Sequence, residues 1–80
     1  INDILVFPNP SNGTLNIALT EKKETTIEIY NLVGELVYTS GNPQNTQLFT
    51  INIDNQPNGI YFVNIKTENN ITTKKVLIAK

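Results

Sequence analysis

The side chains of this sequence that could carry out chemistry are carboxylates and amines. The 80 residues include two aspartates, five glutamates and six lysines, but no histidine, cysteine or arginine. Histidine is the commonest general base and transition-metal ligand, and cysteine thiolates complete most structural zinc sites. These residue types leave two kinds of carboxylate chemistry, namely calcium binding and glycoside hydrolysis.

The carboxylates are too scattered for either kind of site. No Asp-x-Asp-x-Asp loop gathers oxygen ligands at adjacent positions, so we expect no metal and no cofactor. Glycoside hydrolysis needs two acids that face each other across a cleft about 5–10 Å wide, and a compact domain of this length has little room for one. We expect the acids to be solvated on loops and outward strand faces, and the chain to have no enzymatic activity.

Charge and hydropathy exclude further classes of protein. The net charge is −1, and the chain has no arginine, whose guanidinium makes bidentate hydrogen bonds to phosphate or guanine. We therefore expect no nucleic-acid binding. No apolar run approaches the roughly 20 residues that span a bilayer, and the N-terminus lacks the basic and apolar regions of a signal peptide. The sequence starts at Ile1 and contains no methionine, which predicts that further residues are encoded upstream.

The elements that position these side chains are predicted to be β-strands. Ile, Val, Leu, Tyr and Phe alternate with polar residues, and no segment of helical length carries an i, i+3, i+4, i+7 pattern. Clusters of Pro, Asn and Gly separate the alternating runs. The expected strands are 3–7, 15–19, 27–30, 35–39, 49–53, 60–66 and 71–79, with a charged loop at 21–24 and another loop at 40–45.

Seven short antiparallel strands, with turn clusters at roughly 8–12 residue intervals, are typical of an immunoglobulin-like or fibronectin-like β-sandwich. We expect one such all-β domain over residues 1–80, because a chain of this length has no material for a second core. A small open barrel is the alternative.

Three short segments stand out by their order and spacing along the chain. They are residues 7–13 (FPNPSNG), 58–61 (NGIY) and 74–80 (KKVLIAK), with residues 29–34 (IYNLVG) between the first two. Together they resemble the C-terminal sorting domain of the type IX secretion system (the Por secretion system) of Bacteroidetes. The resemblance covers essentially the whole chain, with lysine in place of the arginine that often ends the family's sequences.

The resemblance implies a C-terminal secretion signal. In that family the domain follows a signal peptide and an unrelated passenger, crosses the outer membrane through the type IX translocon, and is usually cleaved off at the surface by a sortase-like protease. The passenger is then often anchored to lipopolysaccharide. We therefore expect export through the periplasm to the outer-membrane surface or the medium, with any enzymatic activity in the passenger upstream.

The site residues implied by the resemblance fall in its three motifs: Pro8, Pro10, Gly13, Gly59, Tyr61, Lys75 and Lys80. We expect the first two motifs to be architectural, since proline fixes φ and glycine adopts positive φ. The ring of Tyr61 should be buried, with its hydroxyl on a backbone acceptor. The last strand is the better candidate for contact with the translocon, because an edge strand offers unpaired backbone groups and its lysines add charge.

Two other functions remain open from the residues alone. Tyr30, Tyr38 and Phe62 could form an outward aromatic strip of a fibronectin-like carbohydrate- or peptide-binding module, or could shield the sheet by cross-strand packing. The other hypothesis is that the chain is a passive spacer of a secreted enzyme. From the residues alone, Lys74, Lys75 and Lys80 are expected to guard an exposed edge of the last strand against unwanted pairing.

Overall fold

The computed structural model describes residues 4–80, which form β-strands and turns. Within this range there is no helix, and hence none that could cross a membrane. All pairings between the strands are antiparallel, which confirms the all-β prediction. The six strands of residues 4–80 are β1 (Leu5–Phe7), β2 (Thr14–Asn31), β3 (Leu36–Thr39), β4 (Gln44–Asn52), β5 (Gly59–Lys66) and β6 (Ile71–Ile78).

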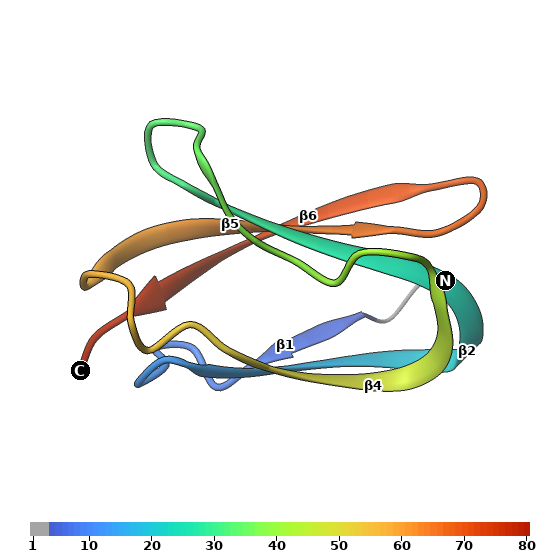
Figure 1. Cartoon of the computed structure of the whole chain (residues 1–80). Coiled ribbons are helices and arrows are strands. Elements are labelled where there is room, and N and C mark those ends of the chain that lie inside the picture. Colours follow the sequence, from blue (N-terminus) through green and yellow to red (C-terminus); the bar gives the residue numbers. More distant parts are fainter. Residues whose placement is uncertain (1–3) are drawn as a thin grey trace.

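Strand β2 connects the two layers of the fold. Its first half pairs with β1 and β4, and its second half pairs with β3 and β5, with β6 added beyond β5. Figure 1 shows β2 turning from the lower layer into the upper one at the end of the molecule where β1 begins. The strands therefore form one curled antiparallel sheet whose two halves face each other.

The prediction of seven strands is wrong, because the expected strands 15–19 and 27–30 are both parts of β2. The expected charged loop at residues 21–24 lies inside this strand, where the pairing with β4 shifts register between Ala18 and Lys23. Such an irregularity bends a strand, and strands that change layers turn corners in this way. Glu21, Lys22 and Glu24 are exposed at this corner, so their charges are solvated without a loop.

Other strand boundaries also differ from the expected ones, most of them by one residue. Strand β4 begins at Gln44, inside the segment expected to be a loop, because residues 44–46 pair with residues 23–25 near the middle of β2. The expected first strand began at residue 3, which lies outside the described residues, and β1 is described from Leu5.

The core fills the space between the two halves of the sheet. Alternate residues of each strand are buried, with Leu15, Ile17 and Ile51 from one layer and Ile27, Val63 and Ile65 from the other at 0–2% exposure. Burying such an aliphatic side chain stabilises a fold by about 1.5–3 kcal/mol relative to leaving it exposed. Among residues 4–80, the buried apolar residues are Ile4, Leu15, Ile17, Leu19, Ile27, Ile29, Phe49, Ile51, Ile53, Tyr61, Val63, Ile65, Val76 and Ile78.

Candidate functional site

Three segments that are far apart in sequence meet at one end of the molecule, which we call the motif end. It consists of residues 8–13 after β1, residues 53–61 around the turn from β4 into β5, and residues 75–80 at the end of β6. Figure 1 shows these segments together at the end where the C-terminus lies, while β1 starts at the opposite end. All seven site residues predicted from the sequence belong to this end.

The segment 9–11 covers the outer edge of β6. The amide of Ser11 donates to the carbonyl oxygen of Leu77 at 2.8 Å, and the amide of Ala79 donates to the carbonyl oxygen of Ser11 at 2.8 Å. The side chain of Asn9 accepts a hydrogen bond from the amide of Leu77 at 3.0 Å and donates to the carbonyl of Lys75 at 3.3 Å. The expectation that β6 offers an unpaired edge is therefore wrong for residues 77–79, since the first motif already occupies it.

Gly13 fastens the first motif to the turn between β4 and β5. It is buried with φ +121°, and a Cβ atom at this position would lie 2.6 Å from the Cβ of Asp54. Its carbonyl oxygen accepts a hydrogen bond from the amide of Ile53 at 2.8 Å. The hydroxyl of Ser11, itself 2% exposed, accepts from the amide of Gly13 at 3.0 Å and donates to the carbonyl of Thr14 at 2.7 Å. Only glycine fits here, both for its backbone conformation and for its lack of a side chain.

The two prolines of the first motif, Pro8 and Pro10, are exposed on the turn after β1, and both follow cis peptide bonds. They flank Asn9, whose side chain carries two of the contacts with β6. The proline rings restrict the backbone on both sides of Asn9, and the architectural role expected of them stays a prediction.

The second motif behaves as predicted. Tyr61 is 4% exposed, and its hydroxyl donates a hydrogen bond to the carbonyl oxygen of Pro57 at 2.6 Å. Gly59 has a φ of +153°, in the region that favours glycine. The burial of the ring and the backbone acceptor of the hydroxyl are thus confirmed, while the architectural role of Tyr61 stays a prediction.

Lys80, which follows β6, is bonded to the turn between β4 and β5. Its ammonium group donates hydrogen bonds to the carbonyl oxygens of Asp54 at 2.8 Å and Gln56 at 2.7 Å, and its amide donates to the side chain of Asn58 at 3.1 Å. The charge of Lys80 is therefore engaged within the domain. Lys75, by contrast, is exposed on the outer face of β6, directly opposite Phe62 of β5.

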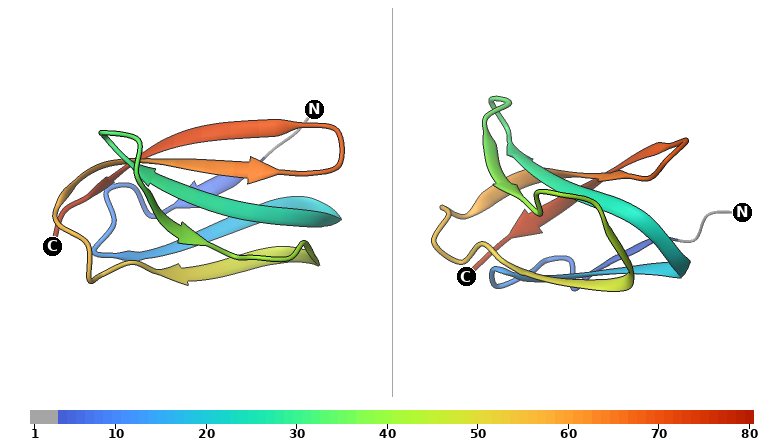
Figure 2. Two further views of the ribbon diagram at one scale, coloured as in Figure 1. Left: turned by 45° about the horizontal axis from the view of Figure 1, so that its top comes forward. Right: turned by 45° about the vertical axis from the view of Figure 1, so that its right-hand side comes forward.

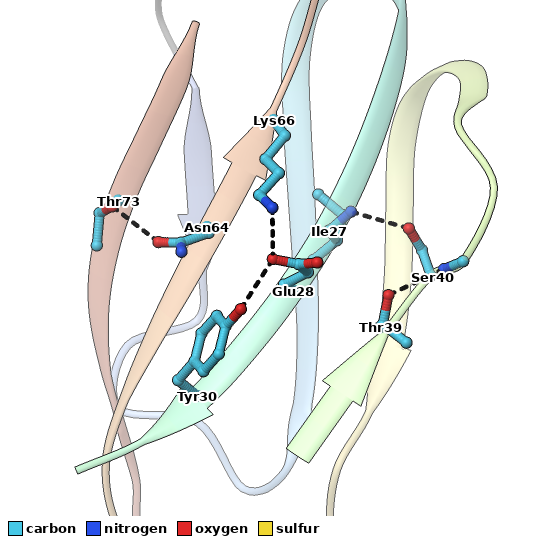
Figure 3. A network of polar contacts seen from close by, with 9 residues as sticks. Ile27, Glu28, Tyr30, Thr39, Ser40, Asn64, Lys66 and Thr73 are labelled. Carbon is cyan, nitrogen blue, oxygen red and sulfur yellow. Dashed lines mark hydrogen bonds and ion pairs between the residues drawn. The ribbon is translucent and has the colours of Figure 1, made fainter. Parts of the chain in front are cut away.

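The outer face of β2 and β5 carries a small polar network, shown in Figure 3. The carboxylate of Glu28 accepts hydrogen bonds from the ammonium of Lys66 at 2.8 Å and from the hydroxyl of Tyr30 at 3.0 Å. The bond from Lys66, with that from Tyr30, lowers the pKa of Glu28, while the bond to Glu28 raises the pKa of Lys66 and the pKa of Tyr30. Among residues 4–80, no group of three or more acids gathers in a way that could hold a metal ion.

The three aromatic residues considered for an outward strip do not share one face. Tyr30 and Phe62 are cross-strand neighbours on the outer face, but Tyr38 packs against the hydrophobic core. Strand β3 pairs Tyr38 with the buried Ile29, and this register turns its ring inward. These three rings therefore do not form one outward strip.

Sequence reasoning did not single out three residues that join the segments of the motif end, namely Asn9, Ser11 and Asn58. Asn and Ser are favoured in turns because their side chains bond to nearby backbone groups. Here Asn9 and Asn58 bond instead to β6 and to Lys80, which are distant in sequence. The sequence feature that could have pointed to these three residues was their place inside the motif segments 7–13 and 58–61.

Comparisons with known proteins give matches over nearly the whole chain. A family model described as a secretion system C-terminal sorting domain matches residues 5–79. An endo-acting ulvan lyase of Formosa agariphila is 30% identical over 82 aligned positions, which cover 99% of this chain and 15% of that protein. An ulvan lyase of Nonlabens ulvanivorans is 32% identical over 81 positions, which cover 98% of this chain and 14% of that protein.

Proposed function

This chain belongs to the family of secretion system C-terminal sorting domains, and from that premise we propose that the type IX translocon recognises it through the motif end. A domain of this family is a C-terminal secretion signal, which directs export to the outer-membrane surface or the extracellular space. The observation that carries the proposal is that all three family motifs meet in one hydrogen-bonded surface. A protein partner can contact such a surface as a single unit.

The domain is proposed to follow a passenger that it exports, as the position of β1 allows. Figure 2 shows β1 entering from the end of the molecule opposite to the C-terminus. A polypeptide joined ahead of β1 would leave the motif end accessible to the translocon. Both ulvan lyases are much longer than this chain: the region that they share with it makes up 15% and 14% of their lengths. Catalysis would then belong to the passenger, and a sortase-like surface protease would cut ahead of β1.

The site residues are proposed to divide into two roles. Lys75 is exposed and would present its charge to a carboxylate of the translocon. Lys80 would act as a positioning residue, because its ammonium holds the carbonyl groups of the turn before Gly59. Pro8, Pro10, Gly13, Gly59 and Tyr61 would keep the three segments in place.

Charge reversal in an exported reporter tests these roles. A fluorescent protein with a signal peptide at its N-terminus and these 80 residues at its C-terminus would carry Lys75→Glu or Lys80→Glu, with Lys22→Glu as the matched control on the exposed corner of β2. We expect both motif-end variants to reduce export and the control to leave it unchanged. Normal export of both variants, with folding shown by circular dichroism, would contradict the assigned roles.

The architecture itself is proposed to be a variant of the immunoglobulin-like sandwich, in which one bent strand serves both layers. The two apolar faces pack together as in such sandwiches.

A carbohydrate-binding role is less well supported than sorting, because Tyr38 is turned toward the core and the hydroxyl of Tyr30 is engaged by Glu28.

A further inference from the structure

Exposed aliphatic side chains extend from the motif end to the hairpin between β2 and β3, and we call them the aliphatic patch. Leu32 and Val33, at the tip of the hairpin between β2 and β3, are 66% and 81% exposed. Ile60 and Leu77 are 37% and 40% exposed and lie directly opposite each other on β5 and β6. Scattered apolar residues are normal on a protein surface, but a contiguous group of them marks an interaction site.

Two hollows make the patch continuous. A groove of about 430 Å³ lies between the hairpin and the start of β5, and Leu32, Val33 and Ile60 are among the residues that line it. A smaller hollow of about 170 Å³ lies beside it and is lined by Asn9, Ile60, Lys75, Val76 and Leu77. Ile60 belongs to both, so apolar side chains of one partner could fill the two hollows together.

The charges around the patch indicate the chemistry of its occupant. Lys75 lines the smaller hollow, and residues 71–80, which include β6, contain three lysines and no acid. The acid that lines the larger groove is Glu35, and its carboxylate accepts a hydrogen bond from the side chain of Asn31 at 2.8 Å. The ammonium of Lys80 is engaged by the turn carbonyls, which leaves Lys75 as the cation at the border of the patch. A partner that places a carboxylate near Lys75 would gain complementary charge at the rim of an apolar contact.

We propose that the aliphatic patch docks a folded protein partner, which buries aliphatic side chains in the two hollows and sets a carboxylate against Lys75. The exposed side chains are aliphatic, whereas glycan sites rely on aromatic platforms. The net charge of −1 does not favour an anionic membrane surface. The inference rests on the proposed sorting function and identifies the surface that the translocon would contact.

The test is export of the same reporter with Val33→Asp, compared with Leu48→Asp as a matched control. Both residues are exposed, at 81% and 54%, but Leu48 lies on β4 in the other layer. A carboxylate in the patch would have to lose its water on docking, so we expect export of Val33→Asp to fall about tenfold, with folded precursor retained in the periplasm. Leu48→Asp should be exported like the unsubstituted chain.

Other outcomes overturn the inference in ways that can be told apart. Normal export of Val33→Asp, or an equal loss for Leu48→Asp, would show that the patch has no specific role. A dimer of the isolated chain in light scattering that Val33→Asp dissociates would make a second copy the occupant, and co-sedimentation with anionic lipid vesicles would make it a membrane. Failure of the unsubstituted chain to export the reporter would reject the sorting function itself, and with it this inference.

Discussion

The amide of Ser11 donates a hydrogen bond to the carbonyl oxygen of Leu77 at 2.8 Å, and this bond joins the first motif of the domain to the last. The two residues come from opposite ends of the sequence, so the contact forms only when the intervening strands are in place. The sorting motifs are consequently parts of one folded surface. Substitutions in one motif should affect the others through the fold.

The close approach of Gly13 to Asp54 gives a first prediction. Gly13→Ala should destabilise the domain by backbone strain of roughly 1–2 kcal/mol and by overpacking of about 1–3 kcal/mol, because the new Cβ would meet Asp54. Gly41→Ala is the matched control, since Gly41 also has positive φ, at +78°, but a Cβ atom added there would have no neighbouring atom within 4 Å. Thermal unfolding of the two variants would separate strain from overpacking. Equal loss of stability in both would show that the contact with Asp54 is unimportant.

Tyr61 provides a second prediction, in which ring and hydroxyl are separated. Tyr61→Phe removes the hydrogen bond to Pro57 and should cost about 0.5–1.5 kcal/mol, whereas Tyr61→Ala also leaves a cavity and should cost about 3–5 kcal/mol. A domain of this length is expected to have only about 4–12 kcal/mol of stability, so the alanine variant should be largely unfolded on warming. Chemical denaturation measures both values, and an unchanged midpoint for Tyr61→Ala would contradict the burial of the ring.

The contacts of Lys80 give a third prediction, which concerns local order. Lys80→Gln should loosen the turn that follows β4 while leaving the core intact, because its ammonium bonds to Asp54 and Gln56 at the surface. The amide of Gln56 should exchange with solvent faster in this variant, and Lys74→Gln should leave its exchange unchanged. Hydrogen exchange followed by NMR measures this directly. Identical exchange in both variants would mean that Lys80 does not hold the turn.

The Glu28 network gives a prediction about pH. The pKa of Glu28 lies below its ordinary value of 4.5, so its contribution to stability is fully present above pH 4.5 and is lost as the pH falls through the folded-state pKa. The pKa of Lys66 lies above its ordinary value of 10.5, so its contribution persists up to pH 10.5 and is lost only as the pH rises further.

Melting temperatures measured from neutral pH down into the acid range should therefore fall more steeply for the unsubstituted chain than for Glu28→Gln. The glutamine keeps the shape of the side chain but has no carboxylate to protonate. Parallel curves for the two chains below pH 4.5 would show that the ion pair with Lys66 contributes nothing measurable, as is true of many exposed pairs.

The sequence was informative where the deciding interactions are local. Alternating residues predicted all of β6 and all but the first residue of β5, and the burial of Tyr61 followed from its place in that alternation. The continuity of β2 was missed, because charged residues at 21–24 are as compatible with an exposed bend as with a loop. Which half of β2 pairs with which strand depends on the three-dimensional register.

The candidate site was predicted in its membership but not in its contacts. The motifs named the right segments, yet nothing in the local pattern showed that Asn9 and Ser11 cover the edge of β6. The bonds from Lys80 to the turn carbonyls were equally hidden, since Asp54 and Gln56 lie 26 and 24 residues earlier in the sequence. Such contacts depend on the path of the whole chain.

The central claim is that these 80 residues are a secretion signal, and export of an unsubstituted reporter tests it most directly. A fluorescent protein with an N-terminal signal peptide and this chain at its C-terminus would be produced in a bacterium with a working type IX system and in a translocon-deficient strain. We predict fluorescence at the cell surface or in the medium of the first strain only. Retention of the reporter in the periplasm of both strains, with the domain folded, would contradict the claim.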